Sequence, residues 1–211
     1  MLLWRNGGDK LLTNGVLYGT SPKQNSERSS KGMQTTTGCL WLTGRSGAGK
    51  TTLAEALRDI ALAEGRPVEV LDGDAMRAQL SPKLGFSKAD RDLHVQRVGQ
   101  ISSRLAIQGV LVIASLISPF EEAREKVRTL HAANGVHFGL VYLNATTEQC
   151  AERDPKGLYA KARQQGTADF TGLTQPYEPP QKPDLVLETG THPLKDCLAE
   201  LEAFARASRF L

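Results

Sequence analysis

The chain has 211 residues, 40% of them apolar, and a net charge of +3. This length suits one α/β domain with its own hydrophobic core. No apolar run approaches the roughly 20 residues that span a bilayer, and the polar residues directly after Met1–Trp4 exclude a signal-peptide core, so we expect a cytoplasmic protein. Residues 1–36 carry the whole charge excess, and the neutral remainder argues against a dedicated nucleic-acid binder.

The three cysteines are Cys39, Cys150 and Cys197. Their number is odd and none are paired at C-x-x-C spacing, so neither a disulfide framework nor a zinc site is indicated. We expect reduced, mostly buried thiols, with a redox switch as the alternative.

Residues 1–36 are rich in small and polar residues and lack sustained periodicity, so we interpret them as a flexible leader, in part non-native sequence. From Thr37 the apolar patterns of strands and helices alternate. We expect strands at 39–43, 68–71, 110–115, 138–143 and 185–187, and helices at 50–63, 88–108, 119–131, 146–153 and 193–206. This alternation predicts one α/β domain at 37–211, with a parallel sheet covered by helices on both faces.

Residues 154–183 break the alternation. They contain three glycines and five prolines among several charged residues. A long irregular segment inside a compact domain is usually functional, most often as a lid. A passive surface loop is the alternative interpretation.

A phosphate-binding motif, G-x-x-x-x-G-K-[ST], stands between the first strand and the first helix. Its residues are Gly44, Arg45, Ser46, Gly47, Ala48, Gly49, Lys50 and Thr51, followed by Thr52. The glycines let backbone amides wrap a phosphate, Lys50 adds an ammonium group, and the Thr51 hydroxyl is a Mg²⁺ ligand. The alternative is a glycine-rich turn that binds no nucleotide. It would require that the motif occur by chance between a strand and a helix. We therefore expect ATP or GTP, Mg²⁺ and phosphoryl transfer. Motors, GTPases and small-molecule kinases share this loop, and a kinase would have a three-layer P-loop kinase fold with a lid.

Two carboxylates, Asp72 and Asp74, flank a glycine at the end of the second strand, and Arg77 follows within one helical turn. Acceptor groups in such folds lie at the carboxyl ends of neighbouring strands. Asp72 is therefore a candidate for orienting or deprotonating a hydroxyl and for holding Mg²⁺, and Arg77 for pairing with an anionic acceptor. The alternative is an Asp-Gly turn with a capping aspartate.

The strand at 110–115 leads into Ile117-Ser118-Pro119 and lacks the terminal Asp that is typical of GTPases and motor ATPases, which favours a kinase. Pro119 is a usual first residue of a helix. Ser118 is a candidate helix cap or, alternatively, an acceptor contact.

At this point the chain resembles the adenylyl-sulfate kinase (APS kinase) family over about residues 38–200. The matching segments are 41–44 with the phosphate-binding motif, 71–74, Leu84-Gly85-Phe86-Ser87, Asp90-Arg91, 117–119, Arg153-Asp154-Pro155-Lys156-Gly157-Leu158-Tyr159, Phe170-Thr171-Gly172 and Pro176-Tyr177-Glu178-Pro179. The lid segments are more specific than the generic P-loop. The resemblance implies transfer of the γ-phosphate of ATP to the 3′-hydroxyl of adenosine 5′-phosphosulfate.

The resemblance also implies roles for individual residues. It makes Asp72 the base, with Lys50 and Ser118 as further catalytic candidates, and Thr51 and Asp72 the Mg²⁺ ligands. It places the acceptor at Asp74, Arg77, Phe86, Arg91, His94, Ile117, Ser118, Lys156 and Phe170, and Arg153 on the ATP adenine. Phe86 and Phe170 as core residues, and Arg91 as a solvated helix charge, remain alternatives.

This chain departs from the usual family pattern at Ala75, His94, Gln96, Leu116, Ala160 and Thr174. His94 matters most, because that position touches the acceptor in relatives. The family also implies a homodimer and a functional link to ATP sulfurylase. Two rival hypotheses are a P-loop kinase for another small hydroxyl compound and a nucleotide-binding module without turnover.

Overall fold

A computed structural model describes residues 10–13, 16–19, 37–154, 157–165 and 175–211, and the chain divides into two compact units, Met1–Thr35 and Thr36–Leu211. In the first unit, β1 (Lys10–Thr13) pairs antiparallel with β2 (Val16–Gly19). This strand pair lies in the segment that we interpreted as an unpatterned leader.

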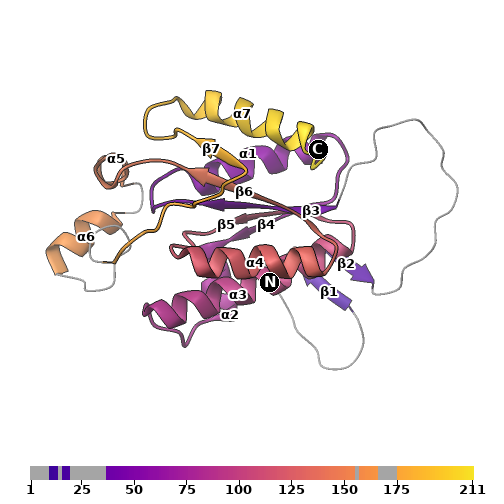
Figure 1. The fold of residues 1–211 in the computed structure, drawn as a ribbon, viewed down its shortest axis with the longest axis horizontal. Coiled ribbons are helices and arrows are strands. Elements are labelled where there is room, and N and C mark those ends of the chain that lie inside the picture. Colours follow the sequence, from indigo (N-terminus) through magenta and orange to yellow (C-terminus); the bar gives the residue numbers. More distant parts are fainter. Residues whose placement is uncertain (1–9, 14–15, 20–36, 155–156, 166–174) are drawn as a thin grey trace, which may run out of the picture. The chain divides into compact units, whose positions relative to one another are not determined.

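The second unit is built on a parallel sheet of five strands in the order β4-β5-β3-β6-β7 (Figure 1). The strands are β3 (Gly38–Thr43), β4 (Val68–Asp72), β5 (Leu111–Ser115), β6 (His137–Leu143) and β7 (Leu185–Leu187). β3 and β5 are buried along their whole length, as expected for continuous apolar runs in the middle of a covered parallel sheet. The expected α/β class and parallel sheet are confirmed.

Helices cover both faces of this sheet (Figure 1). One face carries α1 (Lys50–Ala63) and α7 (Leu194–Ala207), and the other carries α3 (Lys88–Ile107) and α4 (Glu121–Ala133). Three shorter helices are α2 (Gly73–Leu80) and α5 (Thr147–Arg153), which follow strand ends, and α6 (Leu158–Gln165), which lies in the expected lid range. Two of these, α2 and α6, were not expected from the sequence.

The start of α4 differs from the prediction that Pro119 opens the helix. The helix begins at Glu121, and its capping residue is Phe120, which offers no side-chain acceptor. Instead, the Glu121 amide donates to Oε2 of Glu178 at 2.8 Å. A residue 57 positions along the chain therefore caps α4, which local sequence patterns do not reveal.

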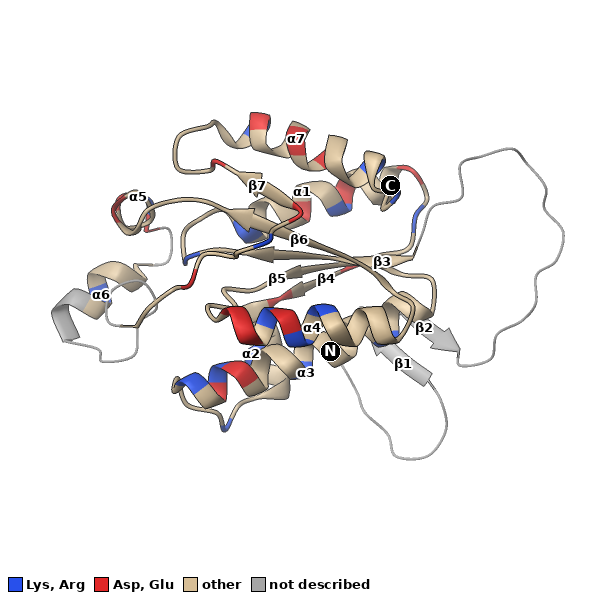
Figure 2. Ribbon diagram, viewed as in Figure 1, with Lys and Arg blue, Asp and Glu red and all other residues tan. Residues whose placement is uncertain are grey.

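Charged residues of both signs are interspersed on the outer helices (Figure 2). On α3 and α4, Lys88 pairs with Asp92 at 2.8 Å, and Lys126 pairs with Glu122 at 2.6 Å. Within the described residues, no helix combines the length and apolarity needed to span a bilayer.

Phe210, next to the last residue, packs against the amino-terminal end of the sheet. The motifs lie at the opposite end of the strands. The Phe210 ring is fully buried and stacks on His137 with ring centroids 4.4 Å apart. A Cβ atom at Gly38 would come within 2.6 Å of this ring, and one at Gly139 within 3.1 Å. Glycine at both positions therefore leaves the space that Phe210 fills.

We predict that Phe210→Ala lowers the free energy of unfolding by about 3–5 kcal/mol, because it removes a fully buried aromatic ring and leaves a cavity. Guanidinium denaturation measures this change. Leu62→Ala, at a position 54% exposed on α1, is the control and should change the free energy by less than about 0.5 kcal/mol. Equal unfolding midpoints for Phe210→Ala and the unsubstituted protein would contradict the packing described.

Candidate active site

The phosphate-binding loop connects the central strand β3 to the first turn of α1. Gly47 (φ 80°) and Gly49 (φ 96°) adopt left-handed backbone conformations that other residues rarely take. Gly49 caps α1 without a side chain, so the first amides of the helix are available to an anion. The Lys50 ammonium donates to the carbonyls of Gly44 at 2.9 Å and Arg45 at 2.7 Å, which holds it beside the loop.

The carboxylate of Asp72 divides its two oxygens between two tasks. Oδ1 accepts from the amides of Asp74 at 3.1 Å and Ala75 at 3.2 Å, and so caps α2. Oδ2 accepts from the Thr51 hydroxyl of the phosphate-binding loop at 2.9 Å. The capping interpretation of this turn is therefore confirmed for Oδ1, while Oδ2 faces the phosphate-binding loop.

The register of the sheet explains why these groups meet. Asp72 of β4 is paired with Ser115 of β5, and Ser115 is paired with Leu42 of β3. The carboxyl ends of the three strands thus lie level. The Ser115 hydroxyl lies 3.5 Å from that of Thr51 and extends the polar cluster by a residue that the sequence analysis did not single out.

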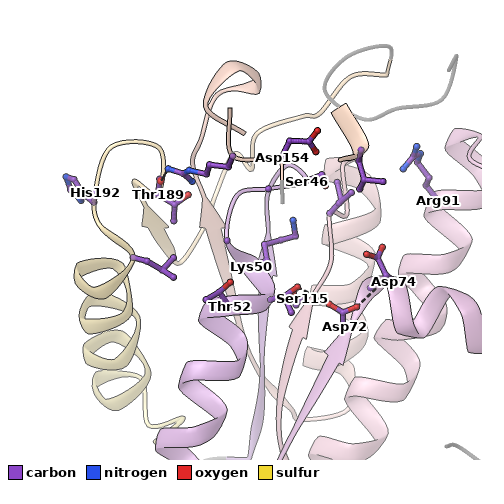
Figure 3. Close-up of a pocket in the computed structure, with 18 of the residues that line it drawn as sticks. Ser46, Lys50, Thr52, Asp72, Asp74, Arg91, Ser115, Asp154, Thr189 and His192 are labelled. Atoms are coloured by element: carbon purple, nitrogen blue, oxygen red, sulfur yellow. Dashed lines mark hydrogen bonds between the residues drawn. The ribbon is translucent and has the colours of Figure 1, made fainter. Parts of the chain in front are cut away.

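One cavity of about 1080 Å³ contains both motifs (Figure 3). It is lined by Ser46, Gly47, Gly49, Lys50, Thr51, Thr52, Asp72, Gly73, Asp74, Phe86, Arg91, Ser115, Ile117, Arg153, Asp154, Leu158, Thr189, His192, Pro193 and Leu194. In Figure 3, Lys50 lies between Thr189 and His192 on one side and Asp74 and Arg91 on the other. The phosphate-binding loop therefore occupies the middle of the cavity.

On the side of the carboxylates, Phe86 carries two guanidinium groups over its ring. The ring centroid lies 4.5 Å from Cζ of Arg77 and 5.3 Å from Cζ of Arg91, and Phe86 is 49% exposed. Arg91 itself is buried, and its Nε donates to the Phe86 carbonyl at 2.9 Å. Phe86 is therefore not a core residue, and Arg91 is not a solvated helix charge.

His94 lies behind this wall and is not among the residues that line the cavity. Its Nδ1 is 3.1 Å from the Ser81 hydroxyl, and its ring makes a backbone hydrogen bond to Gly73. Burial, reinforced by the nearby Arg77 guanidinium, lowers the pKa of His94 to about 4. The ring is therefore neutral at pH 7 and supports the start of α2.

Ile117 lines the cavity, whereas Ser118 does not. The Ser118 hydroxyl is buried, accepts from Nε1 of Trp41 at 3.0 Å and donates to the Thr43 hydroxyl at 3.0 Å. The backbone of Ser118 has a φ of 38°, a costly conformation outside glycine. Its carbonyl is held at 2.7 Å by the buried guanidinium of Arg124, so the residue shapes the wall of the cavity.

The remaining wall comes from the α5–α6 segment and the residues before α7. Arg153, which we expected at the ATP adenine, donates to the Thr189 carbonyl at 2.5 Å. Thr189, His192, Pro193 and Leu194 also line this end of the cavity. Their position after the last parallel strand was the available signal, because ligand sites collect at strand carboxyl ends.

Several expected residues take no part in the lining described. The lining does not include Gly44, Arg45, Ala48 or Arg77. Lys156 and Phe170 lie outside the described residues, as does part of the expected lid at 154–183. The end of that lid range, from Gln175 to Pro183, is described, and Tyr177 in it is fixed to Thr43 by a 3.0 Å hydrogen bond.

This loop, placed between a central parallel strand and a covering helix beside a carboxylate turn, defines a protein of the P-loop kinase class. A family model described as adenylylsulphate kinase matches residues 36–188. A probable adenylyl-sulfate kinase of Aeropyrum pernix is 43% identical over 168 residues, which are 80% of this chain and 92% of the relative. The adenylyl-sulfate kinase of Microcystis aeruginosa is 45% identical over 162 residues, 77% and 87% of the two chains. This chain belongs to the adenylylsulphate kinase family.

Solved structures agree with this assignment. The Mycobacterium tuberculosis APS kinase CysC, in complex with AMPPNP and APS, is similar with a TM-score of 0.78 and 37% identity, over 82% of this chain and 99% of that one. A gluconokinase of Sinorhizobium meliloti shares the fold, with a TM-score of 0.55 and 22% identity over 83% of this chain and 95% of that one.

We predict that His94 makes the fold less stable as the pH falls from 6.5 toward 4, because the unfolded chain binds a proton that the folded chain excludes until about pH 4. His94→Asn lacks this group. The difference in unfolding free energy between the two proteins should therefore shift by about 1–2 kcal/mol in favour of the variant between pH 7 and pH 4.5, allowing for partial solvent screening. Urea titrations at both pH values measure it, and an unchanged difference would contradict a buried neutral ring.

Proposed function

We propose that this chain is an ATP-dependent adenylyl-sulfate kinase. It transfers the γ-phosphoryl group of ATP to the 3′-hydroxyl of adenosine 5′-phosphosulfate, and the products are ADP and 3′-phosphoadenosine 5′-phosphosulfate. The observation that carries the proposal is the single cavity in which the phosphate-binding loop and the Asp72 turn meet, joined by the 2.9 Å hydrogen bond from Thr51. Phosphoryl transfer needs this proximity, because the acceptor oxygen must stand in line with the γ-phosphorus.

On the donor side, the amides after Gly47 and the ammonium of Lys50 would neutralise the phosphate chain of ATP. The Lys50 ammonium has three N–H donors, so a phosphate can join or replace the carbonyls of Gly44 and Arg45 as its partners. Arg153 and the segment at 189–194 form the adjoining end of the cavity, which suits the adenine of ATP.

On the acceptor side, we assign the role of general base to the Asp72 carboxylate, which accepts the proton of the 3′-hydroxyl. The exposed ring of Phe86 provides a flat surface for the acceptor adenine, and the Arg91 guanidinium suits the phosphosulfate. Asp74 and Ile117 complete this wall. An acceptor that is both aromatic and anionic would use both the Phe86 ring and the Arg91 guanidinium.

The hydroxyl of Thr51 and the Oδ2 atom of Asp72 are hard oxygen donors that fit Mg²⁺. Mg²⁺ is usually held by one or two protein groups together with substrate phosphates and water, and when bound it would neutralise charge on the β- and γ-phosphates. The described residues contain no cluster of three or more His, Cys, Asp or Glu side chains that could hold a metal. Thr51 and Asp72 would therefore act with the nucleotide and not as a separate metal cage.

We also propose a cytoplasmic location, supported by three buried free thiols. By analogy with the family we also propose a homodimer and a functional link to an ATP sulfurylase. A solved neighbour from Thiobacillus denitrificans is described as a hexameric APS kinase, and this chain covers 30% of that longer chain.

The proposal predicts that label from γ-labelled ATP moves to adenylyl sulfate and yields labelled 3′-phosphoadenosine 5′-phosphosulfate. Asp72→Asn should lower turnover at least about 100-fold, the typical loss when a general base is removed. Measured without Mg²⁺, it should leave AMPPNP affinity nearly unchanged, because asparagine still caps α2 and the phosphate-binding loop is intact. Chromatography of the products and calorimetry measure the two effects.

The matched control is Asp59→Asn, at an aspartate paired with Arg58 on the outside of α1, which should retain full turnover. Transfer of label to gluconate or a nucleoside, with none to adenylyl sulfate, would replace the acceptor that we propose. ATP binding without transfer to any acceptor would instead favour a regulatory module. Unchanged turnover in Asp72→Asn would remove Asp72 from the role of base.

A further inference from the structure

Tyr159, on the first turn of α6, reaches the phosphate-binding loop. Its side chain is 1% exposed, and its hydroxyl donates to the backbone carbonyl of Ser46 at 2.9 Å across 113 positions of sequence. Burial, with Cys150 close by, raises the pKa of Tyr159 above its usual range, so the hydroxyl keeps its proton. The proposed mechanism does not use this residue.

A phosphate-binding loop works only when its amides face the ligand and its carbonyls face away. In this structure the carbonyls of Gly44 and Arg45 accept from Lys50, while that of Ser46 accepts from Tyr159. The Lys50 ammonium has three N–H donors and can turn toward the phosphates when nucleotide binds, so its contacts with these two carbonyls can change. The Tyr159 bond does not compete with the ligand and can persist through binding.

The start of α6 is itself fixed beside the loop. The carboxylate of Asp154 accepts from the amides of Tyr159 at 3.1 Å and Ala160 at 3.0 Å. The loop also rests on α5, because a Cβ atom at Gly47 would come within 3.0 Å of the Cys150 carbonyl. The α5–α6 segment therefore supports the outer side of the loop, and Tyr159 provides the directional contact.

We propose that Tyr159 is a positioning residue for the nucleotide: its hydroxyl holds the Ser46 carbonyl outward, so that the amides that follow point into the cavity. The inference rests on the proposed function only in taking ATP as the donor. It is independent of the acceptor. Loss of the hydroxyl leaves a carbonyl without this partner and lets the loop populate orientations that bind phosphate less well.

The test is Tyr159→Phe, which keeps the ring in the core and removes one hydroxyl. Calorimetry with AMPPNP should show a Kd raised about 3- to 10-fold, the value of one ordinary hydrogen bond. KM for ATP should rise to the same extent, while KM for adenylyl sulfate should stay within about twofold. Tyr142→Phe is the matched control: the Tyr142 hydroxyl is similarly buried and donates to Asn144 Oδ1 at 3.0 Å at the end of β6, and its loss should leave the Kd for AMPPNP unchanged.

An unchanged AMPPNP Kd in Tyr159→Phe would overturn the proposal. A lower melting temperature accompanied by equal increases in both KM values would also overturn it, because that result describes a purely structural role. Failure of adenylyl sulfate as the acceptor would appear in the label-transfer assay and leave the AMPPNP comparison intact. The two proposals therefore fail separately.

Discussion

The hydrogen bond between Thr51 and Asp72 is the contact on which the site depends, because it joins the phosphate-binding loop to the carboxylate turn after β4. Its existence follows from strand order. β5 is inserted between β3 and β4, and the paired register keeps their carboxyl ends level. A shift of one residue in either pairing would reverse the side-chain directions and point the Asp72 carboxylate away from Thr51. The buried sheet therefore determines the geometry of the polar site at its carboxyl-terminal edge.

The cavity walls are held by contacts between segments that are distant in sequence. The buried Arg124 guanidinium donates to the carbonyls of Ser118 and Glu178, both at 2.7 Å, and so joins the turn after β5 to the described end of the expected lid range. Tyr159 of α6 donates a hydrogen bond to the Ser46 carbonyl of the phosphate-binding loop. Truncating a buried charge such as Arg124 is costly, since its partners are left without a donor. The walls on both sides of the loop are thus rigidly supported.

The sequence predicted the parallel α/β fold and the convergence of the loop with Asp72, because apolar periodicity and the phosphate-binding motif are local signals. It missed the true start of α4, where Glu178 caps the helix from 57 positions away. It missed α2 as a helix, although its cap, Asp72, is a local signal that the Asp-Gly alternative had named. It also missed Thr189 and its neighbours beside Arg153 in the cavity, since these residues carry no motif. His94 and Ser118 were assigned to the acceptor by resemblance, whereas the structure gives both side chains buried partners.

The most direct test of the central claim is a crystal structure of this protein with AMPPNP and adenylyl sulfate bound together. The account predicts the triphosphate chain along Gly44–Thr51 and the ribose 3′-oxygen within hydrogen-bonding distance of the Asp72 carboxylate, in line with the γ-phosphorus. Adenylyl sulfate bound outside this cavity, or with its 3′-oxygen turned away from Asp72, would contradict it.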